Sequence, residues 1–459
     1  MARDAYTLLI ARPLFRFQEG LKRHDTTRRL REMEKSQWWD ATALARYRVE
    51  RLRRFLEHAG ARVPHYREIF QSRGFRPDSI RGLEDLAQLP LLTKADISAN
   101  RTSFVTEGAT HLIPNQTGGS TGEPLQFFVG LERVTSDVAS RCRAMRWWGM
   151  EVGDTEIVLW ASPIEMTRQD RMRGLRDRIL RSTLLAADKM SPEAMDRYLD
   201  TFERVRPVQI FSHGSALCEL ARHAEERGRS MSGLGVRVAF LTSEQLYDHQ
   251  REQIERVFGC KVANGYGARD SGFVAHECPE GSMHLNAEDI ILEVVDDRGA
   301  PVPAGRPGVI VVTNLASGDF PFLRYATGDV AVLEDAPCRC GRSLPVIREI
   351  HGRADDLLLG LDGTRVPGQA VVHLIRRLPS VKAFRVVQEA PDRIRILIVP
   401  MGEFPAGEKD GIVKGVQARL GSGMNVELVP VDDIPLEASG KYRTVLNKIG
   451  TGTSGPARR

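Results

Sequence analysis

The sequence of 459 residues lacks a long hydrophobic run and a segment that looks like an export signal. The apolar stretch 7–11 is cut short by Arg12 and Pro13, so it does not form the hydrophobic region of a signal peptide. No run of about 18 apolar residues occurs, which argues against a transmembrane helix. We therefore expect no membrane insertion and a cytoplasmic location.

Cysteine and lysine are scarce as well. The six cysteines are too sparse for a disulfide scaffold. Ten of the 65 basic residues are lysines, so a functional lysine stands out. The net charge of +5 is mild, and no dense basic stripe with interleaved aromatic residues occurs, so the composition does not indicate a nucleic-acid partner. The arginine-rich segment 168–181 is predicted to be a solvated helix or loop face, with phosphate binding as the alternative.

What the sequence does contain is an alternation of strands and helices. Apolar residues at helical spacing predict helices over residues 26–72. The middle of the chain then alternates the two types of element, which predicts an α/β core with parallel strand pairing. The expected strands are 156–160, 208–212, 236–242 and 261–264, and the expected helices between them are 215–226 and 248–258.

The pattern changes after residue 286. Strands at 289–295 and 309–314, joined by a turn-rich link, predict an antiparallel β segment. A boundary is expected near residue 352, so that 1–352 forms a large α/β domain with mixed α/β subdomains and this β segment. Residues 353–449 are predicted to form a small α+β domain, and residues 450–459, which are small and polar, a disordered tail.

Two short motifs have the composition of nucleotide-binding loops. Residues 117–124 carry three glycines and three hydroxyls, which let backbone N–H groups and side chains approach phosphate oxygens. No Gly-Lys-Ser/Thr closes this loop, so it is not a Walker loop. Residues 264–270 follow a strand and flank Tyr266 with glycines, which lets its ring face a planar base. Each motif alone is also consistent with a structural turn.

Three further motifs follow along the chain. Asp329 ends the segment 324–329 in a tight glycine turn, where a carboxylate is either a turn residue or an acceptor for two ribose hydroxyls. Residues 352–356 mark the expected domain boundary, and 439–441 form a Ser-Gly-Lys loop near the C-terminus. Taken singly, these motifs leave the function open.

The order and spacing of the five motifs resemble the adenylate-forming superfamily of acyl-CoA synthetases, adenylation domains and luciferases. The chain is most similar to the phenylacetate–CoA ligase branch, with its capsular-polysaccharide-type relatives. The residues that point to this branch are 89–94, 338–342, and 277–279 leading to His284. The resemblance covers about residues 40–445.

This resemblance implies an ATP site. The glycine-rich loop would close over the β- and γ-phosphates, and two further segments would form the adenine site, with Tyr266 stacking on the base. Asp329 would hold the ribose hydroxyls, and Arg353 would assist. The loop residues are Thr117, Gly118, Gly119, Ser120, Thr121 and Gly122, and the adenine-site residues are Ser243, Glu244, Gln245, Asn264, Gly265, Tyr266 and Gly267.

The resemblance also implies how the reaction proceeds. Lys441 matches the lysine that reaches the α-phosphate and the carboxylate during adenylation, and Asp355 matches the hinge of a small mobile lid. A lysine and Mg²⁺ offset the repulsion between the two anions. The lid then rotates and admits coenzyme A, whose thiol attacks the acyl-adenylate.

One departure from the family pattern lies at residues 269–270. The family has Thr or Ser and then Glu at these positions, whereas this chain has Arg269 and Asp270. Asp270 keeps the carboxylate that would place magnesium, but it is one methylene shorter. Arg269 replaces a hydroxyl with a cation, which either contacts phosphate or marks a changed substrate.

Four residues suggest a metal site outside the nucleotide motifs. Cys338 and Cys340 lie in a glycine-terminated loop, and Cys278 precedes His284 with five residues between them. Three thiolates and one imidazole suit tetrahedral structural zinc, and ligases of the resembling branch carry similar cysteines. The alternative is a set of reduced, partly buried cysteines.

The leading hypothesis is therefore an ATP-dependent acid–CoA ligase for an aryl or arylacetic acid, with ATP, Mg²⁺ and coenzyme A as its reactants and cofactors. The first alternative keeps adenylation but transfers the acyl group to an amine or a carrier-protein thiol. The second is a non-catalytic relative that has kept the fold. A homodimer is compatible with the resembling branch.

Overall fold

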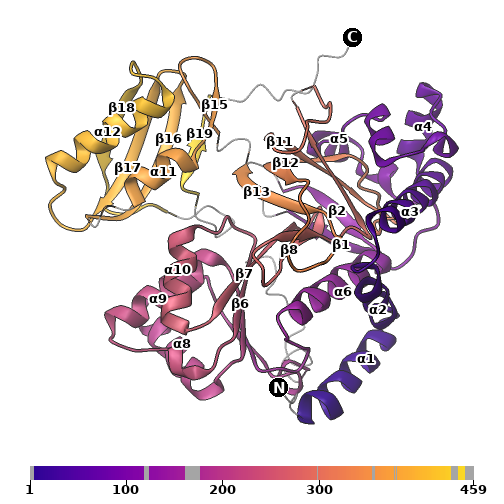
Figure 1. Cartoon of the computed structure of the whole chain (residues 1–459), viewed down its shortest axis with the longest axis horizontal. Helices are drawn as coiled ribbons and strands as arrows, with labels where there is room; N and C mark the ends of the chain where they lie inside the picture. Colours follow the sequence, from indigo (N-terminus) through magenta and orange to yellow (C-terminus); the bar gives the residue numbers. More distant parts are fainter. Residues whose placement is uncertain are drawn as a thin grey trace.

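The structure is a computed structural model that describes residues 5–117, 124–160, 176–296, 298–353, 357–376, 378, 380–435 and 443–449. The chain begins with helices that pack beside one another at one side of the molecule (Figure 1). These are α1 (Arg12–Leu21), α2 (Thr26–Ser36), α3 (Ala41–Arg62), α4 (Pro64–Arg73) and the short α5 (Lys94–Ala99). The helices predicted over residues 26–72 are confirmed. The α4 helix ends at Gly74, whose φ of +59° suits a residue without a Cβ.

An eleven-stranded sheet forms the centre of the molecule, in the order β10-β11-β12-β13-β9-β8-β7-β6-β5-β3-β4. The strands from β4 to β7 pair in parallel, and those from β7 to β10 pair antiparallel. The strands are β3 (Glu156–Leu159), β4 (Ser182–Leu185), β5 (Gln209–Ser212), β6 (Val238–Thr242), β7 (Lys261–Ala268), β8 (Gly272–Glu277), β9 (Met283–Leu285), β10 (Ile290–Val295), β11 (Gly308–Asn314), β12 (Tyr325–Glu334) and β13 (Val346–Arg353). The expected parallel core and antiparallel segment are thus both present, joined in one sheet.

Helices cover both faces of the parallel half. On one face α8 (Pro192–Val205), α9 (Gly214–Glu226) and α10 (Asp248–Phe258) bury a core that includes Leu217, Ile254 and Leu241. On the other face α6 (Leu131–Trp147) packs Met145 against Phe240. Alternate residues of each strand therefore face different helices, as in α/β proteins with a buried parallel sheet.

The C-terminal part builds a separate four-stranded sheet with its own hydrophobic core, drawn in yellow in Figure 1. It contains β16 (Val381–Ala390), β17 (Arg393–Pro400), β18 (Asn425–Pro430) and β19 (Val445–Asn447), with α11 (Gln369–Arg376) and α12 (Ala406–Leu420). A hairpin of β14 (Leu357–Leu359) and β15 (Arg365–Pro367) precedes it. The sequence patterns indicated neither this hairpin nor β19, because three-residue strands carry too little periodicity. The tail expected to be disordered lies outside the described residues.

A buried carboxylate between β9 and β10 ties the N-terminal helices to the sheet. Glu288 is 1% exposed and accepts hydrogen bonds from Arg143 of α6, at 2.6 Å, and from the Ser36 hydroxyl of α2, at 2.5 Å. Arg143 is fully buried and also donates to the side chain of Asn286 at 2.8 Å. This ion pair is therefore shielded from water on both sides.

The neighbouring Asp289 makes the same kind of connection to α3. It is 1% exposed and accepts from Arg29 at 2.5 Å, from Arg51 at 2.7 Å and from the Ser136 hydroxyl. Burial opposes ionisation, but the two guanidinium groups lower the pKa of the Asp289 carboxyl below its ordinary value. Two adjacent carboxylates thus anchor three helices.

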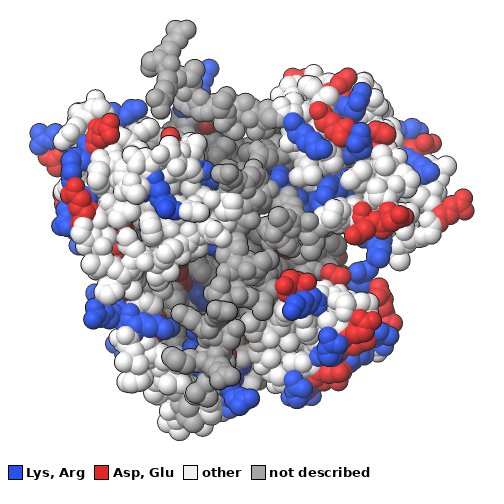
Figure 2. All heavy atoms as spheres, turned by 180° about the vertical axis from the view of Figure 1, so that it is seen from behind, with Lys and Arg blue, Asp and Glu red and all other residues white. Residues whose placement is uncertain are grey.

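No helix among the described residues is long and apolar enough to cross a membrane. Figure 2 shows acidic and basic side chains interspersed over the described part of one face.

We expect Glu288→Gln to lower the free energy of unfolding by about 3 kcal/mol, because Arg143 would remain buried without its counter-charge. Urea unfolding followed by circular dichroism measures this loss. Glu50→Gln is the control, because its ion pair with Arg54 is more than half exposed and such pairs contribute little. Equal losses in both variants would contradict the importance of the buried pair.

Candidate active site and cysteine–histidine cluster

The centre of the candidate site is the C-terminal half of β7, the strand that pairs in parallel with β6 and antiparallel with β8. Tyr266 lies there and donates a hydrogen bond from its hydroxyl to Asp329 Oδ2 at 2.7 Å. Arg353 is paired with Asp329 across β12 and β13, and its Nε lies 3.7 Å from Asp329 Oδ1. Burial and the adjacent Asp329 carboxylate raise the pKa of Tyr266. The structure thus brings together an aromatic ring, a carboxylate and a guanidinium that lie in three separate motifs.

The loop after β6 lies beside this group. Ser243 has a φ of +71°, an uncommon backbone conformation for a residue with a side chain. Glu244 accepts a hydrogen bond from the backbone N–H of Ser215 in the first turn of α9, and Gln245 donates to the carbonyl of Ile350 on β13 at 3.2 Å. The loop therefore connects the parallel half of the sheet with the antiparallel half.

Close neighbours leave little room for side chains at the two glycines of the β7 segment. A Cβ on Gly267 would lie 2.3 Å from the Gly272 carbonyl oxygen, and one on Gly265 would lie 3.1 Å from Nδ1 of His276. Asn264 precedes them, with its backbone N–H bonded to Glu277 Oε2 at 2.7 Å. Only glycine allows β8 to approach so closely at residue 267.

Arg269 and Asp270 form the turn between β7 and β8. Arg133 of α6 donates to the backbone carbonyls of both residues, and the Tyr325 hydroxyl donates to Asp270 Oδ2 at 2.7 Å. Asp270 is 6% exposed. The Arg269 guanidinium donates to the carbonyl of Gln116, the residue that precedes the glycine-rich loop. The cation that departs from the family pattern therefore lies at the base of that loop.

Thr117 closes the base of the glycine-rich loop by pairing with Leu125 through two hydrogen bonds of 3.0 and 2.9 Å. These bonds extend the pairing of β1 (Ile113–Gln116) with β2 (Gln126–Val129). Several predicted site residues lie outside the described residues, namely Gly118, Gly119, Ser120, Thr121, Gly122, Asp355 and Lys441.

A narrow apolar cavity adjoins Gly265 on the α6 side of the sheet. Its lining includes Phe211, Phe240, Phe273 and Met145. As the side chains stand, it has room for little more than a water molecule. The sequence patterns did not indicate this cavity, because its lining comes from α6 and four separate strands.

His276 supplies a polar group to this cavity. It is 8% exposed, stacks on Phe273 with ring centroids 5.3 Å apart, and its Nε2 has no hydrogen-bond partner among the described residues. Residues three positions apart along a regular strand point to opposite faces. The register of β7 and β8 shifts beside Gly267, and this shift brings the rings of Phe273 and His276 to the same cavity. Burial and two nearby arginines, Arg143 and Arg141, lower the pKa of His276 to about 3.

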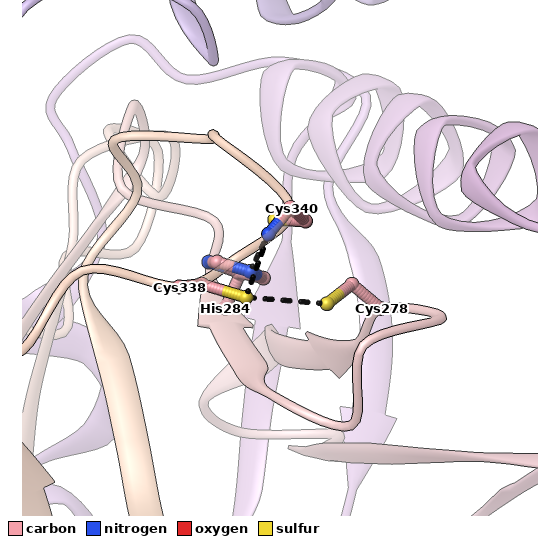
Figure 3. Close-up of side chains that lie close together, drawn as sticks. All are labelled: Cys278, His284, Cys338 and Cys340. Atoms are coloured by element: carbon pink, nitrogen blue, oxygen red, sulfur yellow. Dashed lines mark hydrogen bonds between the residues drawn. The ribbon is translucent and has the colours of Figure 1, made fainter.

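The four predicted metal-site residues lie together, as Figure 3 shows. The ligand atoms of Cys278, His284, Cys338 and Cys340 all lie within 4.8 Å of one another. The Sγ atoms of Cys278 and Cys338 are 3.7 Å apart, and His284 Nε2 lies 3.2 Å from Cys340 Sγ. Two segments about sixty residues apart thus meet because β9 pairs with β13.

The cluster also contains the interactions that orient a metal ligand. His284 Nδ1 is bonded to the Leu344 carbonyl at 3.1 Å, which leaves Nε2 facing the sulfur atoms. Although burial opposes it, hydrogen bonds from Ser282 and Cys340 lower the pKa of the Cys338 thiol. Burial raises the pKa of Cys278 to about 12.

Comparisons with known proteins agree with this architecture. Residues 358–448 match the family model of the CapK C-terminal domain. The chain is 27% identical to a phenylacetate–coenzyme A ligase of Thermus thermophilus, over 87% of this chain and 95% of that protein. It is 24% identical to the protein CapK of Staphylococcus aureus, over 87% of this chain and 88% of that protein.

The chain is similar over most of its length to phenylacetate–CoA ligases and to CapK.

Solved structures of a CoA ligase share the fold of this chain. The crystal structure of 2-hydroxyisobutyryl-CoA ligase in its postadenylation state, with an acyl-AMP bound, aligns with a TM-score of 0.72 at 21% identity. The alignment covers 89% of this chain and 90% of that one. The same ligase in its thioesterification state aligns with a TM-score of 0.60. The resemblance to phenylacetate–CoA ligases and their capsular-polysaccharide-type relatives, predicted from the sequence motifs, is therefore confirmed.

The buried His276 should make the stability of the protein depend on pH. Its folded-state pKa of about 3 lies below the ordinary value of 6.5, so the unfolded chain binds the proton more tightly. Its contribution to stability is complete above pH ~6.5 and is lost as the pH falls toward ~3, by about 1.4 kcal/mol per pH unit.

We therefore expect that His276→Leu loses less stability than the unaltered protein as the pH falls from about 6.5 to 5, with a difference of about 1.4 kcal/mol per pH unit. Urea unfolding at a series of pH values measures the unfolding free energy of both proteins. Above about pH 7.5 the two proteins should have parallel profiles, because His276 is neutral in both states. Parallel profiles over the whole range would show that His276 is not held neutral by its surroundings.

Proposed function

We propose that the protein is an ATP-dependent ligase that joins a carboxylic acid to coenzyme A. The acid carboxylate attacks the α-phosphate of ATP, which gives an acyl-adenylate and releases pyrophosphate. The thiol of coenzyme A then attacks the acyl carbonyl, and AMP leaves. The observation that carries this proposal is the convergence of Tyr266, Asp329 and Arg353 in a chain related over most of its length to phenylacetate–CoA ligases.

The nucleotide would lie along the end of β7. Tyr266 would stack on adenine, between the loop at 243–245 and the glycines at 265 and 267. Asp329 would accept hydrogen bonds from the ribose hydroxyls, and its bond to Tyr266 keeps one carboxylate oxygen oriented. Arg353 supplies a positive charge beside Asp329. The glycine-rich loop at 117–122 would bind the β- and γ-phosphates through its backbone N–H groups.

The adenylation step requires positive charge, because it brings a carboxylate against a phosphate. Lys441 would supply it by reaching the α-phosphate and the acid, delivered by the C-terminal domain about the hinge at Asp355. Arg269, which donates to the carbonyl of Gln116 just before the glycine-rich loop, would bind the leaving pyrophosphate. The Asp270 carboxylate suits Mg²⁺, which when bound neutralises phosphate charge.

The acid would place its apolar part in the cavity beside Gly265. Three phenylalanines and Met145 line this cavity, which suits an aryl or arylacetic acid. Because the cavity is narrow, entry of a ring requires side chains of its lining to move. Transfer to an amine or a carrier-protein thiol in place of coenzyme A would use the same first step, and the assay described below separates these acceptors.

We further propose that the cysteine–histidine cluster holds a structural zinc ion. Tetrahedral Zn–S bonds of about 2.3 Å place two sulfur atoms about 3.8 Å apart, and the sulfur atoms of Cys278 and Cys338 are 3.7 Å apart. Three cysteines and the correctly oriented His284 complete the four ligands of a closed site. When bound, zinc would join the β8–β9 turn to the loop at 338–340.

The activity is tested by pyrophosphate release from ATP and Mg²⁺ with a panel of aryl, arylacetic, fatty and amino acids, with and without coenzyme A. We expect release that depends on an aromatic acid, and acyl-CoA as the product. Acid-dependent release without acyl-CoA would instead favour an amine or carrier acceptor. Absence of release with every acid would contradict the ligase proposal.

Lys441→Ala should reduce adenylation by about 100- to 1,000-fold, because charge that develops on phosphate in the transition state loses its partner. Lys448→Ala, which removes an exposed lysine near the same end of the chain, should retain full activity. Matching circular dichroism spectra show that both variants are folded. Unchanged adenylation in Lys441→Ala would show that Lys441 does not take part in the adenylation step.

For the metal site, the purified protein should contain about one zinc ion per chain by elemental analysis, as four protein ligands define one closed site. Cys338→Ser should lose this zinc and lower Tm, because one ligand is replaced by a hydroxyl. Cys218→Ser is the control, since Cys218 lies on α9, outside the cluster. A zinc-free protein whose Tm does not respond to added zinc would contradict the site.

A further inference from the structure

The N-terminal helical segment exposes apolar side chains where a surface helix normally exposes polar ones. Leu9, Phe17 and Leu21 are 74%, 63% and 70% exposed, and Leu8 is 41% exposed. Leu9 and Leu8 lie in the π-helical turn Thr7–Ala11, which continues directly into α1. Leu9, Phe17 and Leu21 lie along one side of the continuous helix, whereas Leu8 lies to the other side of Leu9. We call Leu9, Phe17 and Leu21 the N-terminal apolar stripe.

The opposite side of the same segment is polar and held against the protein. Thr7 is fully buried and donates from its hydroxyl to the carbonyl of Gly153. Glu19 is 4% exposed and accepts a hydrogen bond from the Thr26 hydroxyl at 2.6 Å. These contacts fix the rotation of the helix, so the apolar stripe faces outward in the folded protein.

The exposed charges of the segment 5–24 are basic, and the exposed Asp25 that follows it pairs with Arg28. Between residues 5 and 24 the only acidic residue is Glu19, which is buried, whereas Arg16, Lys22 and Arg23 are exposed. In Figure 1 this helix lies at the lower edge of the molecule. Besides α2, the segment contacts residues 151–154, through Arg12 with Glu151 and Thr7 with Gly153. The segment thus presents leucine and phenylalanine side chains flanked by basic groups at an accessible edge.

We propose that the N-terminal apolar stripe binds the surface of an anionic lipid bilayer. Leucine and phenylalanine side chains enter the boundary between headgroups and acyl chains, and basic side chains beside them bind anionic headgroups. A second copy of this chain fits less well, because pairing the stripe with itself brings the exposed Arg16, Lys22 and Arg23 of both copies together. The helix lies on the bilayer and does not cross it.

Co-sedimentation of the full chain with vesicles tests this proposal. The probes are vesicles of phosphatidylcholine alone and vesicles that also contain phosphatidylglycerol. We expect binding to the anionic vesicles, weakened by added salt. Phe17→Ser and Leu21→Ser should each weaken binding by roughly tenfold or more, and Arg16→Gln by about fivefold.

Met401→Ser is the matched control, because Met401 is 62% exposed on the C-terminal part of the chain. It should bind vesicles as the unaltered protein does. None of these positions lies in the proposed catalytic site, so pyrophosphate release should be unchanged in every variant. No binding to anionic vesicles, or equal loss in Met401→Ser, would overturn the proposal. A dimer in light scattering that Phe17→Ser dissociates would assign the stripe to a second copy instead.

Discussion

The site depends on the way β7 pairs with its two neighbouring strands, one in parallel and one antiparallel. Its first residues pair in parallel with β6, and its last ones pair antiparallel with β8. The carboxyl ends of parallel strands are where α/β proteins bind ligands, and here the antiparallel half adds Asp329 and Arg353 to that edge. The close approach of β8 requires glycine at residue 267 and produces the register shift that turns His276 toward the cavity.

The rest of the molecule holds this junction in place from both sides. The buried carboxylates of Glu288 and Asp289 bind α2, α3 and α6 to the turn before β10. The same α6 supplies Arg133, which holds the backbone of the β7–β8 turn. On the far side of β8, the cysteine–histidine cluster joins the turn before β9 to the loop before β13. Because buried ion pairs tolerate little displacement, these contacts support a rigid platform beside the separate C-terminal sheet.

Most of the fold was predictable from local patterns. Long amphipathic segments such as α10 and apolar strands such as β6 carry enough residues for their periodicity to be read. The β14–β15 hairpin and β19 were missed because each strand has three residues and is specified by its pairing partners. Of the candidate site, the motifs indicated Tyr266, Asp329 and Arg353, which the structure brings together. The cavity and His276 were missed, since they depend on a register shift that leaves no periodic signal.

The sequence by itself determined the α/β class and the resemblance to adenylate-forming enzymes, because these depend on periodicity and on short motifs in a fixed order. Only the tertiary structure decided which charges are buried together and which way Arg269 points. It also decided that the N-terminal helix turns its leucines and phenylalanine outward. The physical reason is that each of these features depends on contacts between residues far apart in the chain, such as Thr7 with Gly153 and Arg143 with Glu288.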